Sequence, residues 1–194
     1  DFVADSNRWM PHFHIPLQSG SNKILQLMHR KYDTELYKQR IEYIRTKIPH
    51  ACIGVDVIVG FPGETEEDFE ATYQFIHSLD ISYLHVFTYS ERTNTRALKI
   101  DPIVPVEIRR ERNARLRIIS EKKKRAFYEQ FIGTQQSVLF EHENDNGFMN
   151  GYTENYIRVR MPFDENLVNQ IIPIQLSKVH ALGYMEGNRI LTLV

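Results

Sequence analysis

The first residues that could do chemistry lie in an apolar segment near the start of the chain. Alternation over 12–18 predicts a β-strand that carries polar side chains on one face: His12, His14 and Gln18. Ser19 and Ser21 follow at its carboxyl end. Histidines satisfied by neighbours at the edge of a core would explain this pattern without any ligand. The functional alternative is that Gln18, Ser19 and Ser21 lie at the carboxyl-end mouth of a parallel barrel, where the active sites of such barrels lie.

The glycine-containing segment Gly60-Phe-Pro-Gly-Glu64 is a second candidate. A tight turn from a strand into a helix explains both glycines, since glycine adopts backbone conformations that other residues avoid. The functional alternative is that Gly60 and Gly63 let the backbone approach a flat ligand such as an adenine ring. Isolated glycine motifs do not distinguish these two interpretations.

Positive charge is concentrated in one stretch, although the whole chain has a formal net charge of −1. Residues 105–125 hold 9 Lys and Arg against 3 Asp and Glu, whereas 1–104 hold 11 against 14 and 126–194 hold 4 against 8. A solvated helix face would explain the basic stretch. Alternatively it contacts RNA phosphates, and we name three candidates for that role: Arg109, Arg112 and Lys123.

A smaller candidate for RNA contact lies near the end of the chain. Residues 134–194 hold four Lys and Arg against seven Asp and Glu, which is unfavourable for a phosphate-binding domain. A strand over 156–161 would nevertheless place Tyr156, Arg158 and Arg160 on one face. An aromatic ring for stacking beside two guanidiniums for phosphate is suited to RNA. If Tyr156 packs inside a barrel instead, it has only a structural role.

The elements that must position these residues change in character along the chain. In the first part, strands predicted at 12–18, 53–60 and 81–89 alternate with helices near 21–29, 37–48 and after Pro62-Gly63. The run at 53–60 is almost entirely apolar, as in a parallel strand covered on both faces. Thr65 followed by Asp68 predicts a capping box at the start of the last of these helices. The pattern indicates βαβ units and a parallel sheet.

A long helix and a set of short strands are predicted after this α/β part. The helix runs from about Pro105 to Ile132 and ends at Gly133. Short strands at 136–141, 156–161, 171–177 and 190–194 follow at the turn spacing of a small antiparallel barrel. We therefore expect three parts: 1–104, 105–133 and 134–194.

Composition excludes several classes of protein. A chain of 194 residues with 42% hydrophobic residues can bury a core. Its single cysteine, Cys52, excludes an internal disulfide or an iron–sulfur site built from several of its own thiolates. We expect no metal site in the chain, no membrane helix and no signal peptide, and hence a cytoplasmic protein. The start at Asp1, without Met and in the middle of a pattern, suggests an excised fragment.

Four segments together resemble one family: HFHIPLQSGS (12–21), GVDVIVGFPGETEEDF (54–69), LHVFTYSERTNTRA (84–97) and GYTENYIRVR (151–160). In this order they are similar to the radical S-adenosylmethionine (SAM) methylthiotransferases, over essentially the whole chain. The resemblance implies the C-terminal portion of a partial TIM-type (β/α) barrel, followed by a connecting basic helix and a small all-β TRAM barrel that binds RNA.

The resemblance also suggests a branch of the family. Gln18-Ser19 is similar to the tRNA-modifying members, and HFHIPLQSGS with Asn155-Tyr156 looks most like members that thiomethylate N6-threonylcarbamoyladenosine beside the tRNA anticodon. Members that modify isopentenyladenosine are the alternative. A self-sufficient, non-catalytic RNA-binding module on a degenerate barrel is an alternative of another class.

Carried over by position, the resemblance implies a SAM site made of nine residues: Gln18, Ser19, Ser21, Arg30, Ile58, Gly60, Val86, Phe87 and Tyr89. Arg30 would grip the SAM carboxylate, although a solvated arginine at a helix end would look the same. The family motif GxIxGxxE matches Ile58 and Gly60 imperfectly. Asp56 stands where its first glycine is expected, and Glu64 lies one residue too far along the chain. A contact of Glu64 with SAM is therefore in doubt.

The resemblance finally implies what the chain lacks. Members of the family bind two 4Fe–4S clusters through cysteines that have no counterpart here, so we expect no catalytic residue in this fragment and no activity of its own. In the intact protein, SAM is cleaved to a 5′-deoxyadenosyl radical and a methylthio group is inserted into the adenine ring. The partners implied are the tRNA anticodon arm and the N-terminal remainder of the same protein.

Overall fold

The computed structural model describes residues 1–6 and 8–190 and divides the chain into two compact units. The α/β unit comprises residues 13–49 and 53–123, and the barrel unit comprises residues 1–12, 50–52 and the chain from Lys124 onward. The division falls inside one long helix. The limits inferred from the sequence, 1–104, 105–133 and 134–194, stay a prediction.

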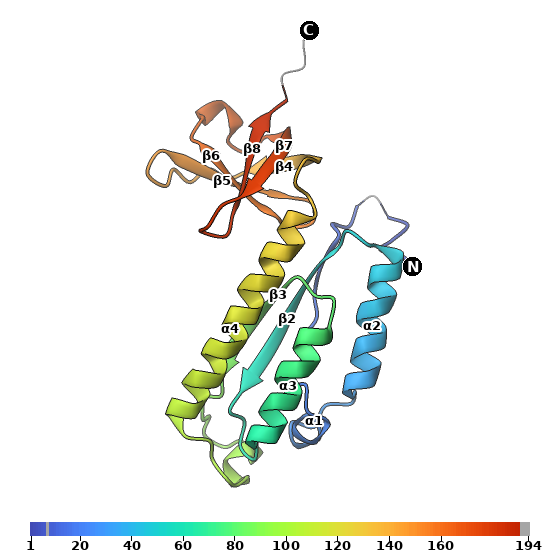
Figure 1. The fold of residues 1–194 in the computed structure, drawn as a ribbon, viewed down its shortest axis with the longest axis vertical. Coiled ribbons are helices and arrows are strands. Elements are labelled where there is room, and N and C mark those ends of the chain that lie inside the picture. Colours follow the sequence, from blue (N-terminus) through green and yellow to red (C-terminus); the bar gives the residue numbers. More distant parts are fainter. Residues whose placement is uncertain (7, 191–194) are drawn as a thin grey trace. The chain divides into compact units, whose positions relative to one another are not determined.

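Three strands and four helices make up the α/β unit (Figure 1). The strands have the order β1-β2-β3 in one sheet: β1 (His12–His14), β2 (Cys52–Val59) and β3 (Tyr83–Thr88). The helices are α1 (Asn22–Leu27), α2 (Thr34–Lys47), α3 (Glu66–Ser78) and α4 (Val106–Glu129), with a short 3-10 helix η1 (Arg96–Lys99) before α4. β2 and β3 pair in parallel, as the βαβ pattern predicts.

The core of this unit forms between β2 and the helices α2, α3 and α4. Ile53, Val55, Val57 and Val59 of β2 are fully buried and contact apolar side chains of these helices. Burial of such side chains contributes roughly 1.5–3 kcal/mol each to folding. The expectation of a covered parallel strand is confirmed on this face of the sheet.

The start of α3 is fixed by the capping box that the sequence predicts. The Thr65 hydroxyl accepts a hydrogen bond from the Asp68 amide at 3.2 Å, and the Asp68 carboxylate accepts one from the Thr65 amide at 3.0 Å. Each bond satisfies a backbone donor that the helix leaves unpaired.

Side chains of α4 form hydrogen bonds with backbone groups of β3. The Ser120 hydroxyl accepts from the Leu84 amide at 2.8 Å and donates to the Leu84 carbonyl at 3.0 Å. The Asn113 side-chain amide donates to the Val86 carbonyl at 3.0 Å. These bonds connect α4 directly to the last strand of the sheet.

The barrel unit is a closed sheet with the strand order β4-β5-β6-β8-β7. Its strands are β4 (Gln135–Phe140), β5 (Phe148–Thr153), β6 (Arg158–Pro162), β7 (Ile171–Val179) and β8 (Met185–Arg189), with a 3-10 helix η2 (Glu165–Leu167) between β6 and β7. The Tyr128 hydroxyl, near the end of α4, accepts from the Arg158 amide at 3.0 Å. Burial raises the pKa of Tyr128 to about 12. The expected fold class, α/β followed by a small β-barrel, is confirmed.

The strands of the barrel differ in detail from those predicted. β5 and β8 were not predicted, and Tyr156 lies in a turn before β6 with a φ angle of 65° rather than in a strand. The turn is closed by a hydrogen bond from the Tyr156 amide to the Thr153 carbonyl at 2.9 Å. The strand expected at 190–194 falls, apart from Ile190, outside the described residues.

No helix in the described part of the chain is both long and apolar enough to cross a membrane.

Candidate functional site

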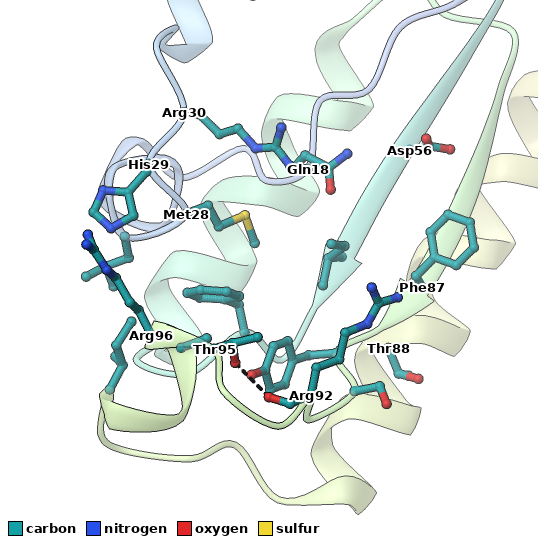
Figure 2. A pocket seen from close by; sticks show the side chains of 17 residues that line it. Gln18, Met28, His29, Arg30, Asp56, Phe87, Thr88, Arg92, Thr95 and Arg96 are labelled. Atoms are coloured by element: carbon teal, nitrogen blue, oxygen red, sulfur yellow. Dashed lines mark hydrogen bonds between the residues drawn. The ribbon is translucent and has the colours of Figure 1, made fainter.

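A cavity of about 810 Å³ lies at the carboxyl ends of the strands of the α/β unit (Figure 2). Residues that follow the three strands line it: Gln18 after β1, Phe61 after β2, and Tyr89 and Ser90 after β3. The end of α1 and the loop around η1 complete its walls. Ligands of parallel α/β sheets bind at this end of the strands, and the volume is within the range of ligand pockets.

The backbone after β1 directs Gln18 into this cavity. Gln18 has a φ angle of 73°, in the left-handed region. The amides of Leu17 and Gln18 both donate to the Asp56 carbonyl, at 3.1 and 2.8 Å. The Gln18 side chain is only 8% exposed and makes no hydrogen bond within residues 1–6 and 8–190. A side-chain amide can both donate and accept hydrogen bonds, so this side chain is well placed to bind a ligand.

Five of the nine residues expected to bind SAM line the cavity: Gln18, Arg30, Ile58, Phe87 and Tyr89. Figure 2 shows the side chain of Arg30 extending toward Gln18. Phe87 is 53% exposed at the end of β3. The Tyr89 hydroxyl is buried and has no hydrogen-bond partner among the described residues. The cavity thus combines apolar walls with polar groups that lack partners.

Ser19 and Ser21 do not line the cavity, contrary to the expectation. The Ser19 hydroxyl lies 3.2 Å from that of Thr72 on α3, and Ser21 donates to the Asp68 carboxylate at 2.8 Å while it caps α1. Both serines therefore attach the loop after β1 to α3. The sequence placed them correctly after a strand but gave no information on which side they face.

Gly60 and Val86 also lie outside this cavity. Gly60 has a φ angle of 75°, its amide donates to the Glu64 carboxylate at 3.0 Å, and a Cβ atom there would overlap the side chain of Arg109. Of the two interpretations of Gly60, the tight turn is the one that these contacts favour. The Val86 carbonyl accepts from Asn113, which turns this part of β3 toward α4.

Sequence reasoning missed the cationic part of the cavity. His29, Arg92 and Arg96 line it together with Arg30. Arg92 and Arg96 lie in the segment LHVFTYSERTNTRA, which carried the family resemblance, but no periodicity distinguishes them from other loop residues. Arg30, Arg92 and Arg96 make no side-chain hydrogen bond or ion pair with any described residue.

A polar array crosses the face of the sheet opposite the core. His14 Nε2 lies 2.8 Å from Asp56 Oδ1, and the His14 ring stacks on that of His85 with 5.3 Å between centroids. Asp56 also lines the cavity. His14 therefore has a structural partner, as the first interpretation of the sequence required.

Arg109, which we expected to contact RNA, is only 4% exposed and holds the loop after β3. Its Nη1 donates to the Tyr89 carbonyl at 2.8 Å, its Nε to the Val104 carbonyl at 2.7 Å, and its Nη2 to the Glu91 carboxylate at 2.6 Å. Both ends of the segment 89–104 are thus bound to one guanidinium.

Arg112 and Lys123 have internal partners as well. Arg112 is 5% exposed and pairs with Glu64 at 2.5 Å and Glu66 at 2.9 Å. Lys123 donates to the carbonyls of His77 and Leu79 at the end of α3, and burial lowers its pKa. An RNA contact by any of these three basic residues would require the loss of such bonds. These three side chains have internal partners because the side of α4 that carries them packs on the rest of the α/β unit.

In the barrel unit, Tyr156 is 46% exposed and belongs to a stack of three rings. Its ring lies 4.3 Å from that of His12 and 5.0 Å from that of Tyr152, between centroids and nearly parallel in both cases. Tyr152 is opposite Arg158 in the register of β5 and β6. The turn therefore brings Tyr156 next to the face of β6 that carries Arg158, although the two residues do not lie in the same strand.

Arg158 and Arg160 share the outward face of β6 but differ in their partners. Arg158 Nε donates to the Asn150 side chain at 3.0 Å, so its charge is not neutralised by that contact. Arg160 pairs with Asp145 at 3.0 Å and lies over the rings of Phe148 and Tyr184. Aromatic rings beside guanidiniums form a surface suited to RNA.

Comparison with known proteins identifies relatives of this chain. Residues 1–76 match the model of the radical SAM superfamily. The chain is 43% identical over 158 residues to the threonylcarbamoyladenosine tRNA methylthiotransferase MtaB of Aquifex aeolicus, a match that covers 81% of the chain and 37% of that protein. With the MtaB of Bacillus subtilis it is 37% identical over 94% of the chain and 41% of that protein.

A relative whose name gives another substrate has nearly the same sequence identity to the chain. The tRNA-2-methylthio-N(6)-dimethylallyladenosine synthase of Endomicrobium trichonymphae is 41% identical over 93% of the chain and 43% of its own length. The chain thus spans 37–43% of the length of these three curated relatives. From the matched superfamily model and this similarity, the chain belongs to the radical SAM methylthiotransferase family.

Proposed function

We propose that the chain is part of a tRNA methylthiotransferase that inserts a methylthio group at C2 of N6-threonylcarbamoyladenosine next to the anticodon. The observation that carries this proposal is the cavity at the carboxyl ends of β1, β2 and β3, which Gln18 and Arg30 line with an amide and a guanidinium. The similarity to two MtaB proteins supports this choice of substrate.

The cavity fits S-adenosylmethionine in its chemistry. Ile58, Phe87 and Tyr89 offer apolar and aromatic surface for the adenine, and Gln18 and Arg30 offer an amide and a guanidinium for the carboxylate. The unsatisfied hydroxyl of Tyr89 adds a polar group at this wall. When bound and reduced, SAM supplies the 5′-deoxyadenosyl radical of the family's chemistry, and these residues bind and orient it.

The described residues do not fit an iron–sulfur cluster. Cys52 is buried, and residues 1–6 and 8–190 hold no group of three or more His, Cys, Asp and Glu side chains that could bind a metal ion. In this proposal the two 4Fe–4S clusters of the active protein are bound by the N-terminal remainder of the same protein.

The anticodon arm of tRNA is the macromolecular partner in this proposal. The stacked rings of His12, Tyr152 and Tyr156 offer a surface for an unpaired base, and Arg158 offers a charge for a phosphate. A cytoplasmic location is part of the same proposal, because the protein must meet tRNA there.

Nucleoside analysis of tRNA tests the proposed function. The full-length gene is expressed in a bacterial strain that lacks its own methylthiotransferases, and digested tRNA is examined by mass spectrometry. We expect 2-methylthio-N6-threonylcarbamoyladenosine. The 2-methylthio derivative of isopentenyladenosine alone would favour the alternative substrate. No methylthio nucleoside, together with retained tRNA binding, would favour a non-catalytic RNA-binding module.

A further inference from the structure

Four cationic or potentially cationic side chains line the cavity: His29, Arg30, Arg92 and Arg96. Its one carboxylate, Asp56, is already paired with His14 at 2.8 Å. The three guanidiniums make no hydrogen bond or ion pair with the residues that the structure describes. The cavity therefore holds more positive charge than the chain neutralises, which favours an anionic ligand.

Two of these arginines lie on a loop with several fixed points. The Thr95 hydroxyl donates to the Arg92 carbonyl at 2.9 Å, as drawn in Figure 2, and Arg96 begins η1. Arg109 binds the carbonyls of Tyr89 and Val104 at the two ends of the segment. Arg92 and Arg96 are therefore presented by an anchored backbone, which reduces the entropy lost when a ligand binds.

The arginines point to different parts of the cavity. Figure 2 shows Arg30 extending toward Gln18, whereas Arg92 extends toward Phe87 and Arg96 toward His29. The cavity thus has one guanidinium beside Gln18 and two on the loop after β3. A single carboxylate, that of SAM, accounts for the first of these places and leaves the second without a ligand.

We propose that Arg92 and Arg96, whose exposed side chains can rotate toward one ligand, bind the carboxylate of the threonylcarbamoyl group of the substrate adenosine, and so select it over adenosines with an apolar group on N6. This inference rests on the proposed function. A guanidinium binds a carboxylate with two parallel hydrogen bonds. A dimethylallyl group has no polar atom, so it cannot accept these charge-assisted hydrogen bonds.

Binding to the full-length protein tests this assignment without turnover. The probes are anticodon stem-loop RNAs that carry either N6-threonylcarbamoyladenosine or its methyl ester, which removes the negative charge and adds one methyl group. We expect the wild-type protein to bind the acid at least about 10-fold more tightly than the ester, as charge-assisted hydrogen bonds imply. In the double variant Arg92→Gln, Arg96→Gln the ratio should fall to about 1, with affinity for the ester unchanged.

Matched controls separate the possible sources of the anion. Lys99→Gln removes a positive charge from the exposed end of the same η1 helix and should preserve the ratio. Arg92→Lys with Arg96→Lys should retain part of it. If the double glutamine variant binds both RNAs equally less well than wild type, the arginines bind RNA phosphates and the inference is wrong. If only SAM affinity, measured by calorimetry, decreases, they bind the SAM carboxylate and the inference is again wrong.

Failure of the proposed function has another signature. It appears as wild-type protein that makes no 2-methylthio-N6-threonylcarbamoyladenosine in cells. Failure of the present inference alone appears as wild-type protein that makes this product while it binds the acid and ester RNAs equally.

Discussion

The guanidinium of Arg109 lies 2.8 Å from the carbonyl oxygen of Tyr89 and donates a hydrogen bond to it. The same side chain binds the Val104 carbonyl and the Glu91 carboxylate. One buried arginine of α4 thus holds the loop that forms a wall of the cavity. Arg109, which the sequence suggested as an RNA-binding residue, thus has a structural role.

We expect Arg109→Leu to destabilise the α/β unit. Two carbonyls lose a charged donor and Glu91, which is about half exposed, loses its partner, so the free energy of unfolding should decrease by about 2–3 kcal/mol. Arg110→Leu, at an exposed neighbouring position, should change it by less than about 0.5 kcal/mol. Urea unfolding measures both. Equal stability of the two variants would contradict the role of Arg109.

The acid sensitivity of the unit should depend on Asp68. Burial would raise the pKa of this carboxyl, but hydrogen bonds from Lys23, Thr65 and Ser21 outweigh burial and hold the pKa below its ordinary value. A lowered folded-state pKa stabilises the fold above the unfolded pKa of about 3.9, and this contribution is lost as the pH falls through the folded value.

Asp68→Asn should therefore cost about 1–3 kcal/mol at neutral pH, and the difference from wild type should decrease as the pH falls below about 4. Urea unfolding at a series of pH values measures this change. Glu111→Gln, which alters an exposed carboxylate of α4, serves as the control and should be neutral. A cost for Asp68→Asn that does not vary with pH would show that the carboxylate charge is unimportant.

Tyr156→Ala should weaken tRNA binding by about 1–3 kcal/mol if the ring stacks on a base, with little change in the salt dependence of binding. Tyr156→Phe keeps the ring and should bind as wild type does. Leu182→Ala, at another exposed position of the barrel unit, controls for loss of apolar surface. Titrations should be paired with melting curves. A lower melting temperature with unchanged affinity would make Tyr156 a purely structural residue.

Arg158 and Arg160 should differ in their effect on salt dependence. Arg158→Gln removes a charge without a carboxylate partner and should flatten the log–log salt slope by about 0.7–0.9 if it contacts a phosphate. Arg160→Gln should do less, because Asp145 already neutralises Arg160. Asp145→Asn should then steepen the slope. Equal slopes for all three variants would exclude this face from phosphate contact.

Local patterns in the sequence predicted those features that depend on near neighbours. The apolar run of β2 and the capping pair Thr65 and Asp68 are confirmed because periodicity and helix-end chemistry are encoded within a few residues. The sequence also predicted a strand over 12–18 with Gln18 as its last residue, whereas β1 ends at His14 and Gln18 forms only an isolated bridge with Val57.

Features that depend on distant partners could not be predicted in this way. A cluster of basic residues looks the same whether it faces solvent or carboxylates, and only the fold brings Arg112 to Glu64. Likewise the Ser19 hydroxyl forms a hydrogen bond with that of Thr72, 53 residues away in the sequence. Arg92 lies in an irregular loop and Arg96 begins the four-residue helix η1, which is too short for periodicity to indicate which side chains face a cavity.

The bonds between α4 and β3 determine how the sheet can grow. Backbone groups of Leu84 and Val86, which another strand would need, are already bonded to Ser120 and Asn113. Helix side chains thus protect this edge against aggregation, as native sheets require. Within the described chain, β1 is the other edge of the sheet. Any further strand, whether from the same polypeptide or from a misassociated copy, must therefore add beside β1.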